Sequence, residues 1–349
     1  MTDKKWLLGT GIAVGLCGVL LTFVGNPANM GFCIACFLRD IAGGLGLHRA
    51  AAVQYLRPEI TGLVWGACLA ALWKREFLPR GGSSPLLRFF LGFGVMIGAL
   101  VFLGCPLRMV LRLAGGDLNA LVGLAGFLAG ILAGVAFLKH GFTLGRNYRQ
   151  NRGEGLAMPA ALLVLPVLLL AAPALLFFSE EGPGSLHAPV LVSLAAGLLA
   201  GGLAQRSRLC MAGGIRDVVL FRDFTLLSGF LALFAAALVG NAVLGSFHLS
   251  FADQPIAHGE ALWNFLGMAA VGLGSTLLGG CPLRQLILTG EGDSDAACAV
   301  LGMLAGAAFC HNFSLASSAS GTTPGGRVAC CLTLALMAGI GLAHSRKAA

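Results

Sequence analysis

Ten apolar runs divide this chain of 349 residues, and each is close to the length of a membrane-spanning helix. Such a helix needs about 20 apolar residues, and the runs at 59–73 and 328–343 are the shortest. Only 11% of the residues are charged, against roughly 25% in soluble domains, which excludes a soluble enzyme, a nucleic-acid binder and a disordered tail. The pattern predicts an all-α polytopic membrane protein with spans at 7–25, 59–73, 86–103, 118–138, 158–178, 188–204, 224–244, 262–279, 295–312 and 328–343.

The loops between these runs differ in charge, and the difference predicts an orientation. Loops 74–85 and 139–157 are rich in Lys and Arg, whereas loops 179–187 and 245–261 contain neither. Basic residues also lie at both ends of the chain: Lys4, Lys5, Arg346 and Lys347. Cytoplasmic loops of membrane proteins carry an excess of Lys and Arg, so we expect both termini in the cytoplasm and an uncleaved first span. The net charge of +8 then reflects orientation, and we expect no nucleic-acid partner.

The chain also repeats itself. The sequence GCPLR at 104–108 recurs at 280–284, and LAGFLAG at 124–130 aligns with VLGMLAG at 300–306, both at an offset of 176. Cys33, followed by Arg39 and Asp40, recurs at an offset of 177 as Cys210, followed by Arg216 and Asp217. These matches predict a duplication, with residues 1–178 and 179–349 as the two halves of a single membrane domain. Five spans per half, an odd number, predict an inverted-topology repeat of 5+5 helices, with a substrate path where the halves meet.

Each GCPLR motif predicts a short half-helix that carries a thiol at its start. Proline is favoured at the first helical position, which leaves Cys105 and Cys281 at the N-cap among free backbone N–H groups. Arg108 and Arg284 follow three residues later, on nearly the same helical face. Positive surroundings make a thiol more reactive. The alternative is a helix break with a packed cysteine, but two equivalent copies favour a functional role.

The segments 31–40 and 208–217 are too short and too polar to span and predict re-entrant pieces. We expect Cys33 and Cys210 to be functional because both halves carry the thiol. Adjacent residues on a helix do not face each other. We therefore expect Arg39, Asp40, Arg216 and Asp217 to form salt bridges with other segments, and substrate contact remains an equal alternative. The GD aspartates, Asp117 and Asp293, are candidates for ion coupling or, more simply, for helix capping and ion pairing.

Together these residues predict a path for a small, soft anion. Thiols are soft ligands, and arginines at membrane depth suggest that an anion is collected there. We expect an outer basic vestibule of Arg39, Arg49, Arg57, Arg108 and Arg112 and an inner one of Arg206, Arg208, Arg216 and Arg284. His48 either lines the outer vestibule or is solvated. No nucleotide-binding motif or metal-ligand spacing is present in the sequence, so we expect no cofactor.

The remaining cysteines have simpler interpretations. Cys33 and Cys36 form a C-x-x-C pair, which indicates either redox exchange or selenium handling, or one functional thiol and one packing thiol. The second half has Gly213 in place of Cys36, so this pair is outside the symmetric core. We expect six others to act as small packing residues: Cys17, Cys68, Cys298, Cys310, Cys330 and Cys331.

The doubled C-x5-R-D and GCPLR segments resemble the YeeE/YedE family of bacterial inner-membrane proteins, the sulphur-transport family, over roughly residues 7–343. The resemblance implies inverted halves with short broken helices that meet at a constriction, and uptake of thiosulfate or a related ion along Cys33, Cys105 and Cys281, with Cys210 as the fourth repeat partner. The form CIACFLRD is similar to the YedE branch associated with selenium metabolism, which implies a selenium species as an alternative substrate.

Three functions follow from the sequence. The first is a non-enzymatic permease for a small sulfur or selenium anion, whose path includes Cys33, Cys36, Cys105, Cys210, Cys281, Arg39, Arg108, Arg216 and Arg284. The second is a membrane thiol–disulfide oxidoreductase that uses Cys33 and Cys36. The third is a membrane protein that hands sulfur or selenium to a cytosolic carrier protein docked on loop 139–157.

Overall fold

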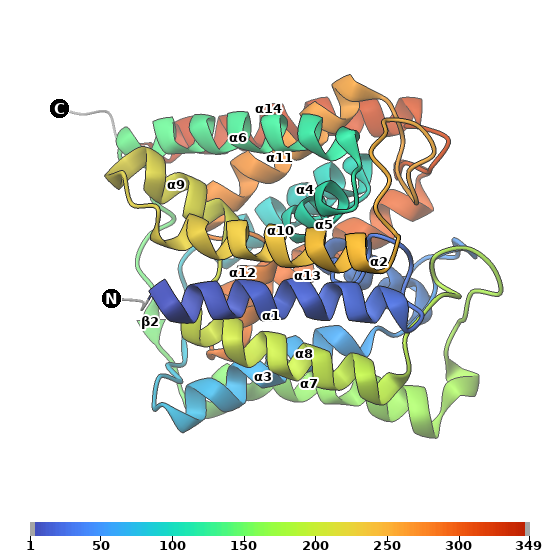
Figure 1. Cartoon of the computed structure of the whole chain (residues 1–349). Coiled ribbons are helices and arrows are strands. Elements are labelled where there is room, and N and C mark those ends of the chain that lie inside the picture. Colours follow the sequence, from blue (N-terminus) through green and yellow to red (C-terminus); the bar gives the residue numbers. More distant parts are fainter. Residues whose placement is uncertain (1–3, 346–349) are drawn as a thin grey trace.

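A computed structural model describes residues 4–345, and within them ten longer helices and four short helices form a bundle (Figure 1). The longer helices are α1 (Lys4–Phe23), α3 (Pro58–Trp73), α4 (Pro85–Phe102), α6 (Leu118–Lys139), α7 (Arg152–Ala171), α8 (Val190–Ser207), α10 (Thr225–Val243), α11 (Ala261–Leu278), α13 (Ser294–Asn312) and α14 (Pro324–Ala343). The short helices are α2 (Ile34–Gly44), α5 (Pro106–Ala114), α9 (Met211–Phe221) and α12 (Pro282–Gly290), with a 3-10 turn η1 (Pro173–Leu175).

The predicted all-α polytopic membrane protein is confirmed. Within the described residues, nine helical segments are long and apolar enough to cross a membrane, and α3 is a shorter apolar helix. Large apolar side chains are exposed on the outer surface, as a lipid-facing surface requires: Leu191 is 76% exposed and Val243 79%. Arg346 and Lys347, which contribute to the predicted orientation, lie outside the described residues.

Two predicted boundaries are wrong. The run at 158–178 is α7, which begins six residues earlier because Asn151 caps it by accepting a hydrogen bond from the Glu154 backbone at 2.9 Å. It ends at Ala171, ahead of Pro173, because proline removes a helical donor and disfavours helix in the residue before it. The last span is also longer than expected, since α14 begins at Pro324 with Thr323 as its N-cap.

The helices of the two halves correspond in order. Helices α11, α12 and α13 follow α4, α5 and α6 at one constant offset, which is that of the two GCPLR motifs, and α9 follows α2 at the offset that relates Cys210 to Cys33. The most extensive packing joins opposite halves in equivalent pairs: α6 packs on α11 as α13 packs on α4, and α3 packs on α8 as α10 packs on α1. The last helix of each half breaks the correspondence, because α7 packs on α3 whereas α14 packs on α11 and α4.

Glycine explains how these helices approach so closely. A Cβ atom on Gly126 or Gly130 of α6 would lie 2.0 Å from a carbonyl oxygen of α11, that of Phe265 or Ala269. The repeat partner Gly302 of α13 would lie 2.0 Å from the Phe89 carbonyl oxygen of α4. Small residues allow membrane helices to pack backbone against backbone. The matching glycine positions of the two halves therefore reflect the same interface used twice.

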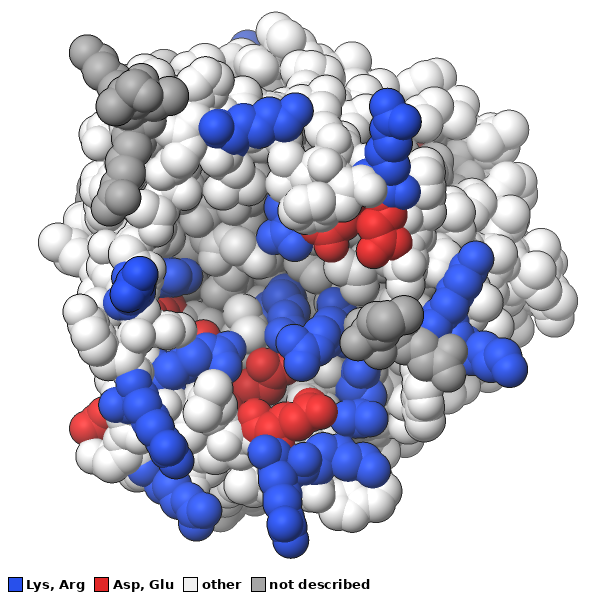
Figure 2. Space-filling model, turned by 90° about the vertical axis from the view of Figure 1, so that its left-hand side faces the viewer, with Lys and Arg blue, Asp and Glu red and all other residues white. Residues whose placement is uncertain are grey.

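The short helices enter the bundle from opposite ends. Figure 1 shows α9 at the end where α1 begins and α2 at the other end. The strands β1 (Arg80–Gly81) and β2 (Tyr148–Arg149) pair antiparallel, with Arg80 opposite Arg149. They join the loop before α4 to the loop before α7, at the end where α1 begins. Lys and Arg gather over this face (Figure 2), as the loop charges lead one to expect.

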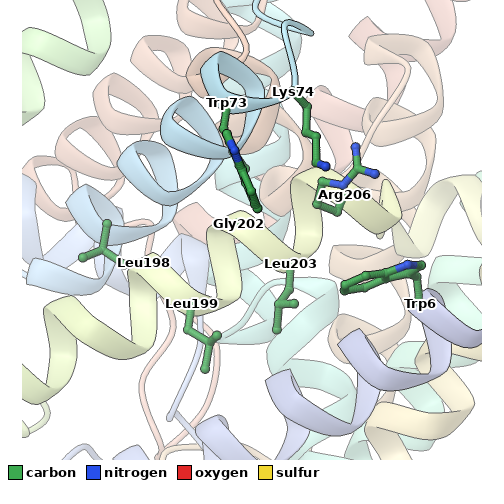
Figure 3. A pocket seen from close by; sticks show the side chains of 9 residues that line it. Trp6, Trp73, Lys74, Leu198, Leu199, Gly202, Leu203 and Arg206 are labelled. Carbon is green, nitrogen blue, oxygen red and sulfur yellow. The ribbon is translucent and has the colours of Figure 1, made fainter.

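A groove on the outer surface marks the same end of the bundle. It measures about 340 Å³ and lies between α1, α3 and α8. Its apolar walls include Trp6 and Trp73, and Lys74 and Arg206 lie at its rim (Figure 3). Tryptophan beside basic residues is typical of the membrane–water interface. The lining of the groove contains none of the cysteines of the repeat.

Candidate functional site

The first half brings two predicted thiols together where α2 and α5 begin. Cys33 is the N-cap of α2, and its Sγ accepts a hydrogen bond from the Cys36 backbone N–H at 3.3 Å. Cys105 is the N-cap of α5, as predicted, and its Sγ accepts from the Ile34 backbone N–H at 3.2 Å. Both cysteines are fully buried. The start of α2 therefore directs its backbone N–H groups at two thiols, an arrangement that favours negative charge.

The second half repeats this arrangement where α9 and α12 begin. Cys210 caps α9 and accepts from the Gly213 backbone N–H at 3.3 Å. Cys281 caps α12, and its Sγ lies 3.9 Å from that of Cys210. These two cysteines are 5% and 3% exposed. The four repeated cysteines thus form two pairs. All eleven cysteines lie within the described residues, and all are free.

The two GCPLR arginines occupy different surroundings. Arg108 is fully buried and donates to the Leu103, Asn29 and Ile256 carbonyl oxygens, with its Nη1 3.5 Å from the Cys36 Sγ. Both Leu103 and Ile256 adopt positive φ, 63° and 51°. This is an outlier for a β-branched isoleucine, and such backbone conformations occur where surrounding structure enforces them.

Arg284 instead forms an ion pair with Glu291 at 3.0 Å. Within the described residues, the cation beside the first pair of thiols contacts carbonyl oxygens and the Cys36 Sγ and has no carboxylate partner. The second pair lies beside a cation with its own carboxylate. Equivalent positions in the repeat thus differ in local charge.

The expectation for the Arg-Asp dipeptides is wrong in part. Arg39 donates to the carboxylate of adjacent Asp40 at 2.7 Å, and Arg216 pairs with adjacent Asp217 at 2.8 Å. An arginine side chain is long enough to fold back along its helix, so sequence neighbours can pair although their Cβ atoms diverge. Asp40 also binds Arg57 at 2.8 Å, which is the predicted link to another segment.

The outer basic vestibule also contains fewer available arginines than predicted. Arg57 and Arg112 are buried in ion pairs with Asp40 and Asp117, because a charge inside a protein must be paired. Arg49 stacks on the Phe177 ring at 3.9 Å from its centroid. Arg39 lines a cavity at the end of α13, and the other predicted outer arginines do not line it.

On the inner side, Arg206 binds Glu76 at 3.2 Å. Arg208 is exposed at the end of α8.

The GD aspartates have the simpler role. Asp117 caps α6 by accepting from the Asn119 backbone at 2.9 Å and pairs with Arg112 at 2.7 Å. Asp293 caps α13 and pairs with Arg80 at 2.7 Å. Capping and ion pairing use both carboxylates, as the simpler alternative predicted.

Sequence reasoning missed a buried carboxylate at the start of α3. Glu59 is fully buried, and its Oε1 accepts from Asn26 at 2.9 Å and from Ser193 at 3.0 Å. Its Oε2 has no hydrogen-bond partner within the described residues. The only signal in the sequence is a Glu at the first position of an apolar run. His48 is likewise buried rather than solvated, and its ring stacks on that of His311 at 4.6 Å.

One of the packing assignments needs correction, because Cys331 is exposed on α14. Cys310 is buried in the core as predicted, and it also lines a cavity described below. The exposed position suits a lipid-facing helix, where a small thiol needs no protein neighbour.

A family model described as sulphur transport matches residues 206–338. No curated protein matches the chain. The matched range runs from the last turn of α8 into α14 and so contains Cys210, Arg216, Cys281 and Arg284. It supports a sulfur-related transporter of the multi-pass membrane class. The internal repeat extends the same motifs to the first half, where Cys33 and Cys105 occupy the equivalent sites.

Proposed function

We propose that this chain is a permease of the bacterial inner membrane for a small sulfur-containing anion. Thiosulfate is the first candidate, and a selenium species of similar charge and softness is the alternative. The observation that carries the proposal is the pairing of Cys33 with Cys105 and of Cys210 with Cys281, buried at the starts of four short helices. The transport family match over the second half supports it.

The chemistry of each thiol pair suits such a substrate. A thiol is a weak hydrogen-bond donor and a soft neighbour for sulfur or selenium. The helix starts around the thiols favour negative charge, and Arg108 or Arg284 adds a cation. A hard anion such as phosphate would need stronger donors than the thiols provide. We place the basic face of Figure 2 in the cytoplasm, which puts the first pair on the outer side.

Uptake of labelled thiosulfate and labelled selenite into cells that express the chain tests this proposal. We expect Cys105→Ala and Cys281→Ala each to lower uptake at least tenfold, because each removes one thiol of a pair. Cys68→Ala is the matched control, since Cys68 is a buried cysteine of α3 outside both pairs. Unchanged uptake in the double variant Cys105→Ala/Cys281→Ala would refute the thiol path. Faster uptake of selenite than of thiosulfate would identify a selenium species as the substrate.

The oxidoreductase alternative rests on the contact between Cys33 and Cys36. Their C-x-x-C segment begins a helix, with the Cys36 backbone N–H 3.3 Å from the Cys33 Sγ. Both side chains are fully buried, which prevents exchange with a protein partner in this conformation. Cys36→Gly reproduces the second half at this position. We expect it to retain uptake, whereas an oxidoreductase would lose all activity.

A cytosolic carrier would dock on the basic face. Loop 140–151 contributes Arg146, Arg149 and an exposed Tyr148, held to the neighbouring loop through β2. Co-purification of a sulfur-carrying protein with the full chain, lost when Arg146 and Arg149 are changed to Glu, would support this role.

A further inference from the structure

A cavity of about 480 Å³ lies at the end of the bundle opposite to the basic face. It is enclosed by the end of α13, the loop 313–323, Arg39 of α2, the loop after α2 and single residues of three further loops. The loop 313–323 is anchored on both sides. The Ser317 backbone donates to the Leu100 carbonyl at 3.2 Å, and Asn312 donates to the Leu47 carbonyl at 2.9 Å.

The lining of this cavity is suited to an anion. It contains a guanidinium, an imidazole and four hydroxyl groups, and no carboxylate from the described residues: Arg39, His311, Ser314, Ser317, Ser318 and Thr323. Arg39 commits its Nε and Nη2 to Asp40, and its Nη1 makes no hydrogen bond within the described residues. The guanidinium thus keeps a donor for a ligand.

Two further polar atoms at the cavity lack partners. Ser317 is only 8% exposed, and its Oγ makes no hydrogen bond within the described residues. The same is true of the His311 Nε2. Buried polar atoms are almost always paired, and leaving one unpaired costs free energy that a bound ligand would recover. The stacked His48 donates to the Arg39 carbonyl at 3.0 Å and so fixes Arg39 and His311 relative to each other.

A chain of contacts leads from this cavity to Cys36, on the helix that Cys33 caps. Leu103 and Ile256 line it, and their carbonyl oxygens hold Arg108, which contacts Cys36 on the α2 side. Both residues have the strained positive φ described above. They therefore form a floor that separates the cavity from the buried thiols.

We propose that this cavity is a binding site for a small sulfur oxyanion, where Arg39, His311 and Ser317 bind its oxygen atoms before it reaches Cys33 and Cys105. The inference rests on the proposed permease function and adds the site at which the anion is first held. A bulk water molecule occupies about 30 Å³, so the cavity admits the anion together with several waters. The site is specific for oxygen-bearing anions because its free groups are hydrogen-bond donors.

Thiosulfate binding to the purified full chain, measured by titration calorimetry, tests the site. We expect Ser317→Ala and His311→Leu each to weaken binding by about tenfold to a hundredfold, the loss expected for a hydrogen bond to a charged group. Ser246→Ala is the control, because Ser246 is exposed in a loop at the same end, away from the cavity. Wild-type affinity in both cavity variants would overturn the proposal.

Uptake into proteoliposomes separates this site from the permease function. The cavity variants should raise KM about tenfold and leave the maximal rate unchanged, whereas Cys105→Ala should abolish uptake and retain binding. Binding that depends on Ser317 without any uptake by the wild type would support the site and refute the permease. Uptake that requires Cys105 but is indifferent to Ser317 and His311 would support the permease and refute the site.

Discussion

Replacing Asp117 by Asn should unfold the protein far more easily than the same change at its repeat partner Asp293. Asp117 and Arg112 are both fully buried and pair at 2.7 Å. An Asn side chain keeps the oxygen that caps α6 but loses the charge, so Arg112 becomes a buried cation without a counter-ion. Removing one partner of a buried ion pair costs about 3–5 kcal/mol. We therefore expect the free energy of unfolding to fall by about that amount.

The repeat provides the matched control. Asp293 caps α13 in the same way, but its partner Arg80 is 22% exposed and has Glu291 at 3.9 Å as a second carboxylate. Ion pairs open to solvent contribute only about 0–1 kcal/mol, so Asp293→Asn should cost no more than that. Reversible unfolding in mixed SDS and maltoside micelles measures both variants under one set of conditions.

A second substitution tests the mechanism of the loss. Arg112→Met in the Asp117→Asn background removes the unpaired charge and keeps an apolar contact with Phe102, whose ring lies 4.2 Å from the guanidinium. Buried ion pairs can be replaced by apolar residues at little cost, so we expect stability to return to within about 1 kcal/mol. Equal losses at Asp117 and Asp293, or no recovery in the double variant, would refute the reasoning.

Three further predictions concern a helix contact, a surface carboxylate and the carboxylate that pairs with Arg284. Gly126→Ala should lower the free energy of unfolding by at least ~2 kcal/mol, because its Cβ would meet a backbone oxygen of α11, whereas Gly339→Ala, with open space around it, should be neutral or slightly stabilising in a thermal melt. A hydrogen bond from Thr322 and the charge of Arg327 lower the pKa of Glu260. The ionised carboxylate therefore stabilises the fold fully above about pH 4.3, the pKa of an unperturbed Glu, and this stabilisation is lost as pH falls through the lower pKa of the folded protein. The difference in melting temperature between wild type and Glu260→Gln should shrink over that pH range. Glu291→Gln should tighten anion binding and slow uptake, an effect that the control Glu76→Gln should not show.

Much of the fold could be predicted from the sequence because few backbone structures can cross a lipid bilayer. A spanning segment must satisfy its own backbone hydrogen bonds, so ten apolar runs of nearly fixed length map onto ten helices. The proline that follows each GCPLR cysteine then predicted Cys105 and Cys281 at helix starts, and the structure shows Cys33 and Cys210 at helix starts as well. The boundary of α7 could not be found by hydropathy, because its first turn is polar and depends on a cap from Asn151.

The sequence could not show which charges neutralise one another. Arg57 and Arg112 looked like free cations, but long side chains reach carboxylates several residues away or on the next segment. The cavity lined by Arg39, His311 and Ser317 could not be predicted from the sequence either. Its polar groups come from α2 and from a loop near the end of the second half, and only the packing of α13 against α2 brings Arg39 and Ser317 to one surface.

The internal repeat accounts for the two thiol pairs, and a residue that differs between the halves, Glu291 in place of Gly115, accounts for their difference. Arg108 has no carboxylate among its hydrogen-bond partners within the described residues, whereas Arg284 is paired with Glu291. An anion should therefore be held more strongly beside Cys33 and Cys105 than beside Cys281. Conduction requires binding that is strong enough for the ion to enter and weak enough for it to leave. We infer that the repeated backbone provides two equivalent thiol sites and that Glu291 weakens anion binding at the second one.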